Sequence, residues 1–240
     1  MTPNSLFTSF LALLIASTTA VDQTVNPGLN AKLKTEATEI DKHNNDLNTD
    51  DAWIFDFNER PNYTFKPGSV VNANAATFPT LTGFGMTMAM LNLGPCAMLP
   101  PHMHSRATNL VVAISGSTST YMYRENGVKL VKADLTPGKM TIFPQGSLHT
   151  MQNNGCDNAV LVSALNSEDT GTTNILNGAL RNFPEDLMKA AFGDASLDIA
   201  KLGKNIPEVG TGSVLGSAEC MQKCKMTVGR SYKRGYKFVT

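Results

Sequence analysis

The chain has 240 residues, with 20 acidic and 20 basic side chains and no formal net charge at pH 7. That length suits one globular domain with additional segments at its ends. The balanced charge excludes binding to nucleic acid or to an acidic surface through overall charge, so we predict no nucleic-acid partner.

The first 20 residues are typical of a secretory signal peptide. Residues 6–16 are mostly apolar, and the small residues STTA precede a cleavage position after Ala20. This run is too short to cross a bilayer, and no later segment is long and apolar enough to do so. We predict a signal peptide at residues 1–20, secretion to the extracellular space and no membrane span; a buried N-terminal helix is the alternative.

Secretion determines how the cysteines and one asparagine are interpreted. Cysteines in an oxidising compartment usually form disulfides rather than thiolate metal sites. Asn62 lies in the only glycosylation sequon, Asn62-Tyr63-Thr64, and we expect it to carry a glycan. The four cysteines predicted to be disulfide-bonded are Cys96, Cys156, Cys220 and Cys224.

The N-terminal part after the signal contains one helix and one strand by pattern. Four apolar residues recur at helical spacing, Leu29, Leu33, Ala37 and Ile40, and predict a short amphipathic helix over residues 29–42. The polar run HNNDLNTDD ends it, and AWIFDFN, residues 52–58, then alternates like a strand. We assign residues 21–79 to an N-terminal extension.

The middle of the chain has a period of two. Short apolar runs alternate there with Gly, Pro, Asn and Asp, a pattern that favours a β-sandwich or β-barrel. We predict an all-β core over residues 80–166, with strands at residues 85–93, 109–115, 119–125, 139–143 and 159–165.

Helical spacing returns after Asn166. NILNGALRN, residues 174–182, is one predicted helix, and PEDLMKAAFG, residues 184–193, is a second one that ends at Gly193. Ser217 is placed to cap a third helix, which carries the last two cysteines. We assign residues 167–225 to a helical arm and residues 226–240 to a basic tail.

The tail combines positive charge with aromatic residues. Six Lys or Arg and no acids occur between Lys223 and Thr240. Such runs are usually solvated and disordered. The functional alternative is attachment to cell-wall polysaccharide or another polyanion.

Three of the four histidines lie on predicted strands beside turns. His102 and His104 are two residues apart, so in a strand both face the same side, and Pro100-Pro101 disfavours a helix there. His149 begins a strand after a Pro-Gln-Gly turn. Imidazole binds Zn, Cu, Fe and Mn, so we predict that the three rings converge on one ion at about 2.0–2.2 Å. His43 lies in a polar stretch and is expected to be solvated.

The two histidine segments resemble the paired boxes of the cupin superfamily, in particular secreted single-domain germin-like and spherulin-like proteins. The likeness to these proteins spans about residues 35–225. It includes FDFN, residues 77–108 and the C-terminal SAECMQKC. In the first box, Ser105 stands where a proline is usual. The residues of the first box are Gly94, His102, His104, Asn109 (in the position of the usual glutamate) and Gly116. Those of the second box are Gly138, Pro144, His149 and Asn153.

The resemblance implies a jelly-roll β-barrel with a short N-terminal helix and a C-terminal helical arm. It implies His102, His104 and His149 as metal ligands, with Asn109 in the place of the fourth ligand. Such relatives usually hold Mn and act as oxalate oxidase, oxalate decarboxylase or superoxide dismutase. The implied cofactor is Mn, and Zn, Fe, Cu or no metal at all are the alternatives.

An asparagine in place of the glutamate changes the charge of this site. Three neutral imidazoles and an amide leave a divalent ion near +2 rather than +1, which weakens Mn binding and makes Mn(III) less accessible. An Asn carbonyl can still coordinate a hard cation, and three histidines suffice for Zn. The alternatives are therefore a metal-dependent oxidoreductase of germin type, a non-enzymatic wall- or spore-associated protein, and a metal-free ligand-binding module.

Two further predictions concern covalent and subunit contacts. If His102 and His149 face each other on antiparallel strands, Cys96 and Cys156 fall almost opposite each other, which pairs Cys220 with Cys224. Sequence alone leaves the other pairings open. The resemblance also implies a homo-oligomer formed through the C-terminal arm; the alternative is that the arm folds back onto its own barrel.

Overall fold

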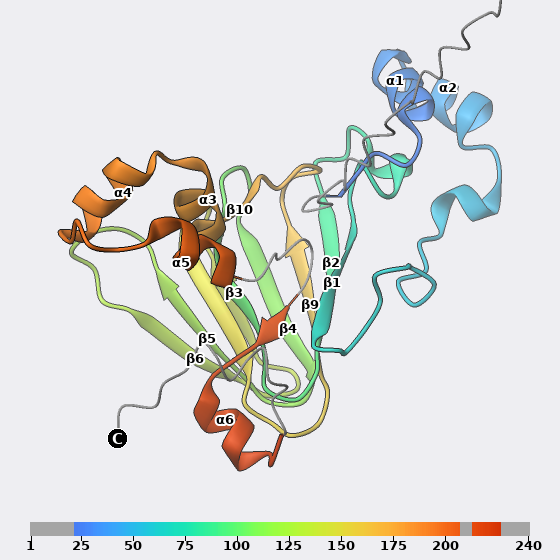
Figure 1. Cartoon of the computed structure of the whole chain (residues 1–240). Helices are drawn as coiled ribbons and strands as arrows, with labels where there is room; N and C mark the ends of the chain where they lie inside the picture. The colour runs from blue at the N-terminus through green and yellow to red at the C-terminus, as the bar shows by residue number, and fades with distance from the viewer. Residues whose placement is uncertain (1–21, 207–212, 227–240) are drawn as a thin grey trace, which may run out of the picture.

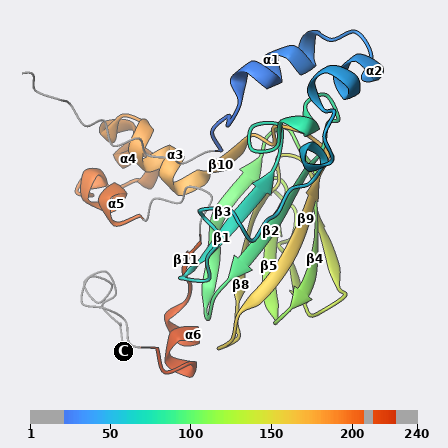
Figure 2. The same cartoon turned by 90° about the vertical axis from the view of Figure 1, so that its right-hand side faces the viewer.

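Two antiparallel β-sheets pack face to face, as Figure 1 and Figure 2 show. The structure is a computed structural model that describes residues 22–206 and 213–226. The first sheet has the strand order β1-β2-β9-β4-β7, and the second has the order β10-β3-β8-β5-β6, with β11 added to β3. The strands are β1 Gly68–Ala73, β2 Thr87–Leu93, β3 Ala97–His104, β4 Asn109–Ser115, β5 Thr118–Tyr123, β6 Val131–Leu135, β7 Met140–Phe143, β8 Leu148–Asn153, β9 Ala159–Leu165, β10 Thr172–Asn174 and β11 Val214–Leu215.

Helices lie at both ends of the sandwich. In both views α6 is at the opposite end from α1 and α2, and α3, α4 and α5 form a separate group beside the barrel (Figures 1 and 2). No helix among the described residues is long and apolar enough to cross a membrane. The α-helices are α1 Pro27–Thr35, α2 Glu39–Asp41, α3 Ile175–Asn182, α4 Glu185–Phe192, α5 Ile199–Asn205 and α6 Ala218–Lys223; a π-helix covers Lys42–Asp46, and 3-10 helices cover Asp50–Trp53 and Pro79–Leu81.

The core fills the space between the two sheets. Alternate residues of each strand point inward; in β2, for example, Ala89 and Leu91 are buried while Met88 is exposed. This alternation is the reason that the period-two pattern predicted the class of fold. The buried cluster consists of Ala89, Leu91, Leu93, Ala97, Leu99, Val111, Ala113, Met122, Leu135, Phe143, Met151, Ala159 and Leu161.

The predicted all-β jelly-roll core is confirmed, and the five predicted core strands appear as β2, β4, β5, β7 and β9. The first sheet also contains β1, which lies in the segment assigned to the N-terminal extension, and the second contains β6, which the pattern did not reveal.

The strand predicted at residues 52–58 was wrong. Asp50–Trp53 forms a 3-10 helix, and residues 54–67 contain no strand. Phe55 instead packs edge-on against Phe57, with ring centroids 4.9 Å apart, and Arg60 lies 3.9 Å from the centre of the Phe55 ring. The alternating aromatic residues therefore form a local cluster rather than one face of a sheet.

Caps explain where several helices begin and end. The helix predicted over residues 29–42 is interrupted, because Thr38 is extended and its side chain accepts a hydrogen bond from the Asp41 amide, which starts α2. Gly193 adopts a left-handed conformation (φ 67°) and ends α4 as predicted. Ser217 caps α6 as predicted.

The predicted cysteine pairing was also wrong. The disulfides join Cys96 to Cys220 and Cys156 to Cys224. His102 does face His149, but the register shifts between Leu99 and His102, and both cysteines of the barrel lie beyond the ends of their strands. Helix α6 packs at this end of the barrel and supplies a partner to each of them.

Candidate metal centre

Three buried histidines from two neighbouring strands meet inside the barrel. β3 pairs with β8 so that His102 lies opposite His149, and His104 follows two residues along β3 on the same face. The ring centroids are 4.2 to 5.3 Å apart. One ligand nitrogen from each ring lies within 4.8 Å of the others. The predicted convergence of the three side chains is therefore confirmed.

One nitrogen of each ring already has a partner. His102 Nδ1 lies 2.7 Å from the Pro100 carbonyl oxygen, and His149 Nδ1 lies 2.9 Å from the Ser147 carbonyl oxygen. Each carbonyl accepts a hydrogen bond, so both Nδ1 atoms are protonated donors and each Nε2 carries a lone pair. The remaining Nδ1, of His104, lies 3.0 Å from Thr172 Oγ1. Metal-binding histidines are oriented by contacts of this kind.

Electrostatics keep the three imidazoles neutral. Burial lowers the pKa of His104 to about 3, with a smaller contribution from His102. Burial, assisted by His102, lowers the pKa of His149 to about 2, and burial also lowers the pKa of His102. Neutral imidazole is the form that binds a metal, so these rings need not lose a proton at neutral pH.

His149 has a buried ring nitrogen without a hydrogen-bond partner in the described part of the chain. Its side chain is 2% exposed, and its Nε2 is buried with no hydrogen-bond partner among the described residues. A buried polar atom without a partner costs free energy. A metal ion held jointly with His102 and His104 would remove that cost.

Asn109 lines the same cavity as His102 and His104, as the sequence predicted. It is the first residue of β4 and lies opposite Phe143 of β7 and Leu165 of β9. The side chain is 3% exposed, and among the described residues its Oδ1 has no hydrogen-bond partner. The amide oxygen is thus a second buried acceptor available to an ion.

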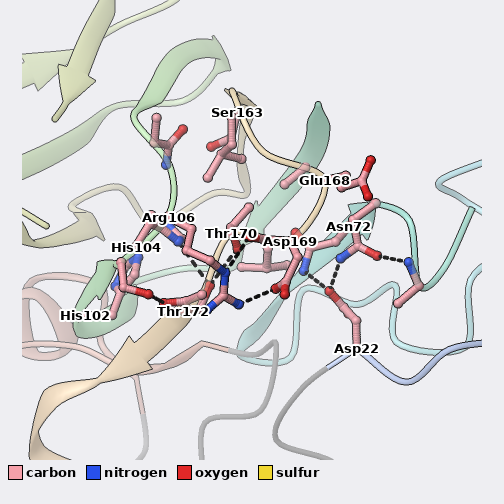
Figure 3. A pocket seen from close by; sticks show the side chains of 18 of the residues that line it. Asp22, Asn72, His102, His104, Arg106, Ser163, Glu168, Asp169, Thr170 and Thr172 are labelled. Carbon is pink, nitrogen blue, oxygen red and sulfur yellow. Dashed lines mark hydrogen bonds and ion pairs between the residues drawn. The ribbon is translucent and has the colours of Figure 1, made fainter. Parts of the chain in front are cut away.

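The cavity beside the histidines has a volume of about 660 Å³. Apolar side chains of the barrel, including Leu91, Leu99 and Met151, line one part of it, and polar side chains line the rest. Figure 3 shows His102 and His104 at one end of the view and Asp22 at the other, with the Arg106–Asp169 ion pair between them in this view. His102 and His104 thus share one cavity with Asp22.

Sequence reasoning missed three residues at this site. The Phe143 ring stacks on His149 with centroids 4.2 Å apart and planes 9° apart, and Thr172 contacts His104. Asp22 lines the cavity from a segment near the start of the described chain. Phe143 directly precedes Pro144 of the second box, which could have drawn attention to it; the other two lie in no motif.

Several residues of the two boxes serve the backbone instead of the metal. Asn153 Nδ2 donates to the carbonyl oxygens of Leu93, Gly94 and Asp157 at 2.7 to 3.1 Å, which fixes the turn after β8. Gly116 has a φ of +77°, and a Cβ there would lie 2.5 Å from the Cβ of Ala159.

Comparison with known proteins agrees with this geometry. The cupin family pattern matches residues 56–198. Spherulin-1A of Physarum polycephalum is 29% identical over 202 residues, 83% of this chain and 80% of the spherulin. Germin-like protein 1-3 of Oryza sativa subsp. japonica is 35% identical over 130 residues, 52% of this chain and 57% of that protein.

Solved structures give the same fold. An oxalate oxidase superposes with a TM-score of 0.58 over 65% of this chain and 81% of its own chain, at 22% identity. At that identity the likeness carries the fold alone. With two facing antiparallel sheets and a histidine cluster inside, the chain belongs to the cupin family. Within that family it is of the germin-like and spherulin-like kind.

Proposed function

We propose that the protein is a secreted germin-like or spherulin-like cupin that binds one divalent metal ion through His102, His104 and His149. The observation that carries the proposal is the set of three neutral imidazoles, each with Nδ1 engaged, together with the buried and unpartnered Nε2 of His149. An ion bound at about 2.0–2.2 Å would hold its ligand atoms about 3–3.5 Å apart, so only a small inward adjustment of the rings is required.

Manganese is the proposed metal, because this kind of cupin resembles Mn-dependent proteins. We expect Asn109 to lower the affinity of the site for Mn. The amide oxygen can coordinate the ion but adds no negative charge, so the site stays near +2. Mn is held weakly by any given donor set, and Zn, Fe or Cu would bind the same imidazoles more tightly. A bound ion would act as a Lewis acid toward a ligand in the cavity.

Two alternatives keep support from particular observations. The cavity of about 660 Å³ beside the histidines would admit the substrate of a Mn-dependent oxalate oxidase or superoxide dismutase. Alternatively, the cavity could serve a metal-free extracellular module that binds small ligands. Asn109 supports a non-enzymatic role, since a site without the carboxylate stabilises Mn(III) less well.

Metal analysis decides between these alternatives. We would measure bound Mn, Zn, Fe and Cu in protein purified from its native secretion, together with oxalate oxidation and superoxide dismutation. The comparison variant is His149→Gln, which keeps a polar side chain but replaces the imidazole nitrogen that carries the ligand lone pair with an amide. Near-stoichiometric metal in the wild type and little in the variant supports the proposal. Equal metal content in both contradicts it.

We also propose that the chain forms a homo-oligomer through an apolar surface. On the outer face of the first sheet, Met88, Ala164, Leu110 and Ile142 lie in one row across four strands, and the three larger side chains are 40–48% exposed. Five strands of this length present a face of roughly 20 Å by 20 Å, about half of the roughly 800 Å² that each partner buries in a standard interface. The helical arm offers a second surface, with Leu187 60% exposed.

Light scattering on full-length variants would identify the surface. Leu110→Lys introduces charge on the sheet face, Leu187→Lys introduces it on the arm, and Val131→Lys on the other sheet is the control. Loss of mass with Leu110→Lys alone supports the sheet face, and loss with Leu187→Lys alone supports the arm. A monomeric wild type contradicts self-association.

The basic tail supports a separate proposal of attachment to an anionic extracellular surface. Its residues 227–240 lie outside the described residues, and so does the predicted signal peptide. Attraction of this kind weakens with salt, because charges are screened within about 8–10 Å at moderate ionic strength. Retention on cell-wall material at low salt should fall when the chain ends at Lys225. Equal retention of both forms would reject the tail as an anchor.

A further inference from the structure

Strand β3 contains one residue more than the part of β8 that faces it. Leu99 of β3 lies opposite Met151 of β8. The next paired residue of β3, His102, lies opposite His149, so two residues of β3 face Thr150 alone. Buried and less buried residues alternate without a break along β8, whereas the alternation in β3 breaks between Leu99 and His102. The extra residue therefore belongs to β3 and forms a β-bulge there.

This bulge decides which face of β3 carries the histidines. In a regular strand, residues three apart point to opposite faces, so His102 would point away from the core that Leu99 enters. With the bulge, Leu99, His102 and His104 are all buried. A slip of the strand by one residue would turn both histidines to the outer face. The candidate metal centre thus depends on this irregularity.

The apolar pattern of β3 alone would favour a regular strand. A regular strand that continued from Leu99 would bury the apolar side chains of Pro101 and Met103. It would place both histidines on the outer face, where water can reach their polar ring atoms. The observed strand instead buries two imidazoles and leaves Met103 half-buried, an arrangement that costs free energy. Contacts outside the apolar pattern must therefore hold the bulge.

Two side chains engage carbonyl groups of the bulge. Thr150, on the opposite strand, donates from Oγ1 to the Leu99 carbonyl oxygen at 2.6 Å. His102 Nδ1 donates to the Pro100 carbonyl oxygen at 2.7 Å. The two residues at the bulge are prolines, which have no amide N–H to leave unpaired. Of these two contacts, the one from Thr150 comes from a side chain that is not itself a proposed metal ligand.

We propose that Thr150 is a positioning residue that holds β3 in the bulged register and so turns His102 and His104 into the cavity. It acts through the Leu99 carbonyl, directly before the bulge, rather than through a bond to the ion. This inference rests on the proposed function, because the side chains that Thr150 orients are the proposed metal ligands. A bound ion would stabilise the same register, since a slipped strand would leave only His149 in the cavity.

Chemical labelling of the histidine rings measures the register without any metal. Full-length protein in chelator is treated with diethyl pyrocarbonate at neutral pH, and mass spectrometry scores each of the four histidines. His43 is exposed and serves as an internal standard for the labelling rate. His149 lies on the regular strand β8, so it reports general loosening of the barrel.

The variants separate the hydroxyl of Thr150 from the shape of its side chain. Thr150→Val keeps the branched shape and removes the hydroxyl, so labelling of His102 and His104 should rise about tenfold over the wild type, as expected for the loss of one hydrogen bond. Labelling of His149 should stay unchanged. Thr150→Ser keeps the hydroxyl and should label like the wild type. Thr87→Val is the matched control, because Thr87 Oγ1 donates to the Ser167 carbonyl at 2.7 Å in the first sheet, and it should also label like the wild type.

Equal labelling of His102 and His104 in the wild type and Thr150→Val overturns the proposal. A rise that includes His149, or that also occurs in Thr87→Val, overturns it as well, because either result shows general loosening. If Thr150→Val does not fold, deletion of Pro101 in the same chain should restore folding, since a strand without the extra residue needs no bulge; failure to restore it contradicts the proposal.

Added Mn separates this inference from the proposed function. Mn should protect His102 and His104 from labelling in the wild type, because the ion binds only the bulged register. A labelling difference between the wild type and Thr150→Val that persists while Mn protects neither ring overturns the metal proposal alone.

Discussion

Replacing Asn109 with glutamate should make the stability of the protein depend strongly on metal. The position is 3% exposed, and its side-chain oxygen has no hydrogen-bond partner among the described residues. Without metal, Asn109→Glu buries an uncompensated carboxylate, which typically costs about 3–5 kcal/mol. Protonation limits this cost: raising the pKa of a glutamate from about 4.3 to 7 corresponds to about 3.7 kcal/mol. We expect a loss of about 3–4 kcal/mol at pH 7.

Bound Mn should offset most of this loss. The carboxylate lowers the charge of the site from near +2 to near +1, and a hundredfold gain in affinity would add about 2.7 kcal/mol of stability at saturating metal. For a protein of this size, 1 kcal/mol shifts the Tm by about 2–4 °C. Asn109→Glu should therefore melt about 6–16 °C below the wild type in chelator and recover most of that difference in Mn.

The matched control is Asn109→Gln, which has the size of glutamate without its charge. Both variants add one methylene to a packed site, so their difference isolates the charge. Thermal unfolding in chelator and in excess Mn, with the disulfides intact, measures the effect. An equal Mn-induced rise in Tm for the Glu and Gln variants would refute the reasoning and place position 109 away from the ion.

Three further predictions follow from the contacts around the site. Because burial lowers the pKa of His104 to about 3 and that of His149 to about 2, protons compete with metal only in strong acid. Metal affinity from calorimetry should therefore change by less than about tenfold between pH 7 and pH 5, whereas three ordinary imidazoles would lose more than about a thousandfold in affinity. Thr172→Val removes the contact to His104 Nδ1 and should lower metal affinity about 10–100-fold, while Thr172→Ser should not; equal affinities would show that the contact does not orient the ring. Non-reducing peptide mapping should find Cys96 linked to Cys220, and a Cys96–Cys156 peptide would contradict the structure. Removing the Cys96–Cys220 bridge, which spans 124 residues, should lower the free energy of unfolding, measured in urea, by about 4–5 kcal/mol.

The sequence predicted the parts of the fold in which local pattern and tertiary environment agree. β4 and β9 appear at their predicted bounds, because their alternating residues face a core on one side. The shared orientation of His102 and His104 also followed from strand geometry, since residues two apart share a face. Asn109 lines the same cavity as His102 and His104, and it is the first residue of β4.

The parts that failed depend on contacts that a local pattern does not contain. The cysteine pairing required knowledge that the register shifts after Leu99 and that α6 returns to the far end of the barrel. Residues 52–58 alternate like a strand, but no sheet edge is available, so Phe55 packs against Phe57 instead. Asp22 belongs to no motif, and only folding brings it to the cavity, where it accepts a hydrogen bond from Asn72, 50 residues later in the chain.

An anomalous-difference map from crystals of the Mn-loaded protein, recorded at the Mn absorption edge, would test the metal centre most directly. We predict one peak per chain among the Nε2 atoms of His102, His104 and His149, at about 2.0–2.2 Å from each. A peak elsewhere in the chain, or rings that stay apart with no peak between them after Mn loading, would contradict the proposed metal centre.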